Sequence, residues 1–150
     1  MATLAWNARS YARYAESYVR SIYERNADAP TQLERAHPYL EAVADSLDAL
    51  YYLDPARGQE WEDMRISIEE AKWFVDNQRG KLLESGSLTA EALAGIKATG
   101  KMLEILDGAF PVEISRGQRP RAVFKSDRFE AAHAAALDYI NNDLTRTVGD

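Results

Sequence analysis

Apolar residues recur along most of this chain at alternating intervals of three and four, the spacing of one face of an α-helix. In the first segment the repeating positions are Leu4, Ala8, Tyr11, Ala15, Tyr18 and Ile22. The third segment repeats Trp61, Met64, Ile68, Ala71, Val75 and Leu82 in the same way. The whole pattern predicts five helices, at about residues 3–26, 32–53, 55–85, 89–107 and 127–145. It therefore favours an all-α bundle of about five helices.

Several polar residues and prolines stand where helices are expected to begin. Thr31 and Glu34 have the spacing of a capping box, in which each side chain bonds a free backbone N–H at the start of a helix. Pro55 suits the first position of the third helix, where its missing N–H costs nothing. Ser87 or Thr89 can cap the fourth helix. These signals predict the order of elements without deciding which helices touch.

The third predicted helix is long for a chain of 150 residues. A helix over residues 55–85 would extend about 45 Å at about 1.5 Å per residue. Either it bends, or part of it packs against another chain. A homodimer formed through this helix is accordingly one expected partner.

The least regular segment, residues 108–125, precedes the last helix. Two short runs that favour β-structure, 111–115 and 121–124, flank a polar turn that contains Gly117. The pattern predicts a long loop or a small β-hairpin. Its three arginines, Arg116, Arg119 and Arg121, are too polar to bury and are candidates for contact with an acidic protein groove or a nucleic-acid backbone.

The composition excludes several classes of protein. A chain of this length buries roughly 70% of its unfolded surface, enough for one domain spanning residues 1–150. Because the chain has no cysteine, it has no disulfide framework, zinc knuckle, iron–sulfur cluster or thiol nucleophile. No segment has the ~20 apolar residues of a membrane span, and the N-terminus lacks the apolar run of a secretory signal. A cytoplasmic protein without membrane contact or cofactor is the expectation.

The charge is unevenly distributed along the chain. Lys and Arg number 18 against 24 Asp and Glu, a net charge of -6 that disfavours binding of nucleic acid by the molecule as a whole. Residues 28–56 carry a net charge of -5, whereas residues 109–126 carry +3. A local anionic contact through residues 116–121 therefore stays open. Glu41, Asp45 and Asp48 share one helix face and form a candidate acidic docking surface.

The two histidines of the chain each follow a glutamate by three residues. The pairs are Glu34 with His37 and Glu130 with His133. Two such pairs, with two further glutamates, form the di-metal site of ferritin-like bundles, so a di-metal carboxylate protein is one alternative function. Pro38 opposes this interpretation because proline disfavours helical geometry in the residue before it.

A second alternative rests on Arg128 and His133. The segment from Arg128 to His133 resembles the Arg-x4–6-His signature of the all-helical HEPN ribonucleases. The resemblance covers six residues. It implies a metal-independent ribonuclease in which the arginine and histidine act on the RNA phosphate and the 2′-hydroxyl, usually across a dimer.

The remaining features favour a non-enzymatic function. No glycine-rich phosphate loop and no Gly-x-Ser-x-Gly element occurs in the sequence. The sequence predicts a small interaction protein, such as an adaptor, regulator or inhibitor, that docks on a larger protein. Proteins of this kind also occur among phage and mobile-element proteins. The arginines of 116–121 and the acids of 41–48 are the predicted contact residues.

Overall fold

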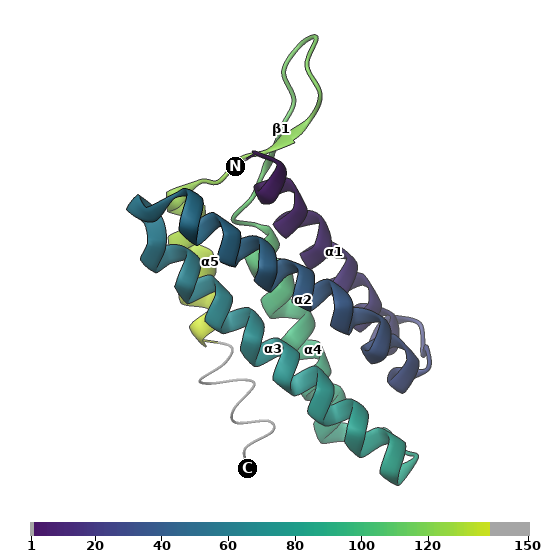
Figure 1. Cartoon of the computed structure of the whole chain (residues 1–150). Helices are drawn as coiled ribbons and strands as arrows, with labels where there is room; N and C mark the ends of the chain where they lie inside the picture. The colour runs from purple at the N-terminus through teal and green to yellow at the C-terminus, as the bar shows by residue number, and fades with distance from the viewer. Residues whose placement is uncertain (1, 139–150) are drawn as a thin grey trace.

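The computed structural model describes residues 2–138, and it is built almost entirely of helices (Figure 1). The five α-helices and two short strands are α1 (Ala2–Glu24), α2 (Ala29–Leu53), α3 (Gly58–Ser85), α4 (Ala90–Asp107), β1 (Val112–Glu113), β2 (Arg121–Ala122) and α5 (Ser126–Asp138). A single 3-10 turn, Pro55–Arg57, precedes α3. The predicted all-α bundle is confirmed. Residues 139–145 of the last predicted helix lie outside the described residues.

The helices form a bundle in which α1 is the central element. It packs along α2 on one side and along α4 on the other, and α2 in turn packs along α3 (Figure 1). The direct contact between α3 and α4 is small, and α5 packs on both of them. The short connections from α1 to α2 and from α2 to α3 explain why these sequential helices are neighbours, whereas α4 packs mainly along α1.

The predicted apolar face is confirmed for α3 and shifted for α1. All six residues predicted for the seam of α3 are buried. In α1 the buried line consists mainly of small residues: Ala5, Ala8, Ala12, Ala15, Val19 and Ile22. Tyr11 and Tyr18 are only half-buried, with their rings 6.0 and 5.7 Å from that of Tyr39 on α2. Because α1 lies between two helices, its narrow face is buried and its tyrosines lie at the flank.

The start of α2 differs from the prediction. The helix begins at Ala29, after the N-cap residue Asp28, and the hydroxyl of Thr31 donates to the carboxylate of Asp28 at 2.7 Å. Thr31 and Glu34 therefore form no capping box. Pro38 lies inside α2, as the predicted range 32–53 required, and the helix continues through it, so Glu34 and His37 lie on one continuous helix. Because Pro38 has no N–H, α2 lacks one backbone hydrogen bond there. The burial of apolar residues on either side of Pro38 outweighs the free-energy cost of that missing bond.

The starts of the next two helices agree better with the sequence. Pro55 begins the 3-10 turn, and α3 follows at Gly58. Thr89 caps α4, where its hydroxyl accepts the backbone N–H of Ala92 at 3.1 Å. The predicted cap of the fourth helix is thus confirmed at Thr89.

The length of α3 is matched by its neighbour. It has 28 residues and α2 has 25, so the two are about 42 and 38 Å long at about 1.5 Å per residue. The length of α3 alone therefore requires no second chain. Across the described residues, no helix combines the length and apolarity that crossing a membrane would need.

The insert before α5 is a β-hairpin, which is one of the two forms that the sequence predicted, the other being a long loop. Val112 pairs with Ala122 and Glu113 pairs with Arg121 in antiparallel register. Ala122 is buried and the hairpin base packs against α1. The base is thereby fixed to the bundle, while the rest of the hairpin extends beyond the first turn of α1 (Figure 1).

Candidate functional site

The hairpin tip, residues 114–120, is the most prominent projection of the described chain (Figure 1). Its turn is closed by a hydrogen bond from the backbone N–H of Gln118 to the carbonyl of Ser115 at 3.0 Å. Gly117 has a φ of 76°, a backbone conformation that residues with a Cβ rarely adopt. Ile114 is 78% exposed at the start of the tip. The tip therefore contains a hydrogen-bonded turn and an apolar side chain in solvent.

The three predicted arginines divide into two groups. Arg116 and Arg119 are exposed on the tip, and neither forms an ion pair in the part of the chain that the structure describes. Arg121 lies in the strand, with its Nη2 3.7 Å from Oε2 of Glu113. Lys125 approaches the same carboxylate, with 3.0 Å between Nζ and Oε1. Of the three predicted arginines, Arg116 and Arg119 are the two that have no carboxylate within ion-pair distance among the described residues.

The charged residues at the hairpin base act on one another. The hydrogen bond from Lys125, followed by its charge, lowers the pKa of Glu113. Glu113 thus stays ionised and holds Arg121 and Lys125 near the base. At the base one carboxylate thus faces two cations, whereas no carboxylate faces the two arginines of the tip in the described chain.

The predicted acidic surface on α2 is exposed, but one of its members already has partners. Glu41 Oε1 lies 3.1 Å from Nε2 of His37 and 3.4 Å from Nζ of Lys72 on α3. The hydrogen bond with His37 is the largest cause of a lowered pKa for Glu41. Asp45 and Asp48 remain exposed without an ion pair within residues 2–138. Glu41 therefore belongs to the α2–α3 contact, and only the two aspartates form a free acidic surface.

The two Glu-x-x-His pairs do not converge. His37 contacts Asp76 of α3, with 2.7 Å between Nδ1 and Oδ1, although without hydrogen-bond geometry. His133 contacts Asp63, with 3.7 Å between Nε2 and Oδ2. These two aspartates are 13 residues apart on α3, or about 20 Å. The histidines are thus held at separate places along the bundle.

The glutamates of the two pairs are also apart. Oε2 of Glu34 lies 3.5 Å from Nη2 of Arg79, and Glu130 is exposed on α5. Among the described residues, no three histidine, aspartate or glutamate side chains are arranged to hold a metal ion. The structure therefore gives no support to the di-metal alternative.

Arg128 and His133 both lie on α5, but they point in different directions. Five residues of helix correspond to a rotation of about 140° beyond one full turn. Arg128 is exposed, whereas His133 is half-buried beside Asp63. A single chain therefore does not bring the two side chains to one reacting phosphate, as the ribonuclease alternative would need.

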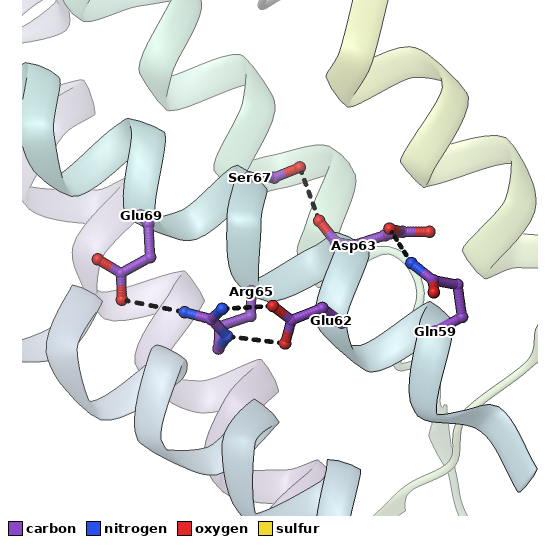
Figure 2. Close-up of polar contacts among 6 residues, drawn as sticks. All are labelled: Gln59, Glu62, Asp63, Arg65, Ser67 and Glu69. Carbon is purple, nitrogen blue, oxygen red and sulfur yellow. Dashed lines mark hydrogen bonds and ion pairs between the residues drawn. The ribbon is translucent and has the colours of Figure 1, made fainter. Parts of the chain in front are cut away.

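The acids on the outer face of α3 are partly neutralised by Arg65 (Figure 2). Its guanidinium forms a two-point contact with Glu62, including a bond from Nε at 3.0 Å, and lies 3.9 Å from Glu69. The hydrogen bond from Arg65 lowers the pKa of Glu62. In the same view, the amide of Gln59 donates to Asp63 at 2.8 Å. This face is less acidic than its sequence indicates.

A polar groove between α1 and α4 was missed at the level of sequence. It has a volume of about 530 Å³, and its charged lining residues are Arg9, Arg13, Glu16, Arg20, Glu104 and Asp107. The three guanidinium groups and three carboxylates balance one another. The i, i+4 and i+11 spacing of Arg9, Arg13 and Arg20 along one polar face was visible in the sequence. Two of the three acids, Glu104 and Asp107, come from α4 and could not be assigned to this groove from spacing.

Asp107 is the least satisfied group of this groove. Burial raises its pKa, an effect that the nearby Arg9 and Arg13 partly offset. Its Oδ1 accepts no hydrogen bond, and Nε of Arg9 is 3.8 Å away. Because the folded chain holds this proton more tightly than the unfolded chain, the stability it contributes is present at acidic pH and is lost as the pH rises through the raised pKa.

The chain matches no protein-family model, no curated protein and no solved structure. The candidate site therefore rests on geometry, and the hairpin tip is the surface that combines projection, uncompensated charge and an exposed apolar side chain.

Proposed function

We propose that this protein is a small, non-enzymatic interaction module that docks through its hairpin tip on an acidic surface of a larger protein. The observation that carries the proposal is the pair of uncompensated arginines, Arg116 and Arg119, on the same projecting turn as the exposed Ile114. Arginine presents five donors in a planar fork that matches carboxylates, and it is enriched where binding energy is concentrated.

A protein partner suits this tip better than a nucleic acid. Ile114 offers an apolar anchor, and a phosphate backbone has no apolar surface to receive it. The net charge of -6 would also repel a polyanion from the rest of the molecule. An acidic protein groove with an apolar floor accommodates both kinds of side chain.

The test is reversal of the tip charge. The double variant Arg116→Glu/Arg119→Glu is expected to weaken binding of the captured partner at least about tenfold, because each attraction becomes a repulsion. Affinity capture from the native host identifies the partner, and titration of the purified partner measures the dissociation constant. Raising the salt concentration should weaken the wild-type complex.

The matched control changes the same net charge elsewhere. Arg25 and Arg35 are exposed and have no ion pair in the described part of the chain, so Arg25→Glu/Arg35→Glu should leave binding within about twofold of wild type. An equal loss of partner affinity in both double variants would contradict the proposal. Release of the captured material by nuclease would instead identify a nucleic acid and would equally overturn it.

A second proposal concerns self-association through α3, carried by the geometry of its outer face. Ile66, Trp73 and Gly80 are seven residues apart on one face, and Trp73 is 61% exposed. In an antiparallel pair centred on Trp73, Ile66 of one copy opposes Gly80 of the other, where open space surrounds the glycine. The like charges of Glu70 and Asp76 also meet, so salt should strengthen this contact.

Sedimentation over a range of concentrations tests this contact. Trp73→Ala is expected to raise the dimer dissociation constant at least about tenfold, as for a central aromatic residue of an interface. Leu83→Ala is the control, since Leu83 is also exposed but lies about 80° around the helix from Trp73. A monomer at every concentration, or an equal effect of both variants, would contradict self-association through this face.

A further inference from the structure

A small pocket lies between the base of the hairpin and the end of the bundle. It has a volume of about 270 Å³, and its walls include Leu50 of α2, Trp61 of α3 and Phe124, which follows β2. Two cationic side chains, Arg57 and Arg121, also line it. The pocket thus combines apolar walls with positive charge, a combination that differs from the charge-balanced groove between α1 and α4.

One wall residue of the pocket, Trp61, carries an unpaired hydrogen-bond donor. Trp61 is only 1% exposed, and its Nε1 has no hydrogen-bond partner. The ring is packed between aromatic neighbours, with centroids 4.4 Å from Phe124 and 6.2 Å from Phe110. A buried donor without an acceptor costs about 1–3 kcal/mol. Because Nε1 is itself buried, an acceptor in the pocket would remove this cost once the indole ring shifts slightly toward it.

The positive charge of the pocket is incompletely compensated. The guanidinium carbon of Arg57 lies 4.8 Å from the centroid of the Phe124 ring. Within residues 2–138, no carboxylate lies within ion-pair distance of Arg57. Arg121 shares Glu113 with Lys125, so one carboxylate faces two cations. An anion in the pocket would therefore meet a net positive charge.

We propose that this pocket binds a small monocarboxylate with an apolar body. The carboxylate would bind the guanidinium groups of Arg57 and Arg121, with the indole N–H of Trp61 as a further donor, while the apolar body packs on Leu50 and Phe124. The volume is just below the usual range of about 300–1,000 Å³ for ligand pockets, which restricts the ligand to about the size of 3-phenylpropionate. The proposal does not rest on docking by the hairpin tip.

The experiment follows the indole N–H of Trp61 by NMR during titration with 3-phenylpropionate. The double variant Trp6→Phe/Trp73→Phe changes two exposed residues and leaves Trp61 as the one tryptophan of the chain, so its indole signal is unambiguous. A saturable shift of this resonance is expected, and Arg57→Gln should raise the dissociation constant about tenfold or more because it removes a charged hydrogen bond. The thermal unfolding midpoint of each variant checks that it is folded.

Three comparisons make the result specific. Arg116→Gln removes a cation from the tip and should leave the dissociation constant unchanged. The neutral analogue 3-phenylpropan-1-ol should bind at least about tenfold more weakly than the acid. A short peptide ending in a phenylalanine carboxylate, compared with its amide, distinguishes a free acid from the C-terminus of a partner protein as the natural source, and binding of either carboxylate supports the site.

The outcomes that overturn the proposal are distinct from those that overturn tip docking. Absence of a shift at millimolar acid, equal binding of the alcohol, or an equal effect of Arg57→Gln and Arg116→Gln each contradicts a carboxylate site. Arg116→Glu/Arg119→Glu should weaken partner binding without affecting the titration of Trp61. Failure of one proposal therefore leaves the other testable.

Discussion

Trp61→Ala is expected to lower the free energy of unfolding by about 3–5 kcal/mol, the cost of removing a large aromatic side chain from a packed core. Trp61 is 1% exposed and packs against Phe110 and Phe124. These contacts join α3 to the segment after α4 and to the hairpin base, so the cavity would lie where three parts of the chain meet. Total stability for a domain of this kind is about 5–15 kcal/mol.

Trp73 supplies a matched control on the same helix. It is 61% exposed, so Trp73→Ala should change the free energy of unfolding by less than about 1 kcal/mol at a concentration where the chain is monomeric. Urea denaturation followed by far-ultraviolet circular dichroism measures both variants. Similar losses for the two would mean that the hairpin base does not close the core as the structure describes.

Gly100→Leu is expected to lower the free energy of unfolding by about 1–3 kcal/mol, the usual cost of overfilling a packed contact. A Cβ at Gly100 would lie 2.7 Å from Oη of Tyr23 and 3.4 Å from Cγ1 of Val19. Tyr23 can rotate away from a single methyl group, but a leucine would also displace the helix backbone around Val19. The substitution therefore tests how closely α4 approaches α1.

Gly80 is the control of opposite sign. No atom lies within 4 Å of a Cβ built at this glycine, so Gly80→Ala should raise the free energy of unfolding by about 0.5–1 kcal/mol through its higher helix propensity. Thermal and urea unfolding of both glycine variants give the comparison. Stabilisation by Gly100→Leu would contradict the close packing of α1 and α4.

The sequence predicted which residues belong to the candidate site, but only partly which of them act together. The sequence identified Arg116, Arg119 and Arg121 as one basic loop, because polar residues between β-favouring runs mark a turn. It could not separate Arg121 from the other two. That separation depends on the strand register, which places Arg121 opposite Glu113.

The pocket at the hairpin base was not predictable at all. Its cationic residues, Arg57 and Arg121, are far apart in sequence, and Trp61 was identified only as a core residue of α3. The sequence pattern that marks Trp61 as buried is the same whether or not its indole N–H has a hydrogen-bond acceptor. Only the positions of the neighbouring atoms show that Nε1 of Trp61 lacks an acceptor.

The sequence by itself determined the number and order of the helices, the buried face of α3 and the place of the hairpin, because the helical period, turn residues and β-favouring runs act locally. Tertiary structure alone decided which face of α1 is buried, since α1 packs between α2 and α4 and alanines allow both to approach. It also decided that His37 and His133 contact different aspartates about 20 Å apart along α3. Spacing fixes the face of a helix on which a residue lies, but the neighbour opposite that face follows from how the helices pack.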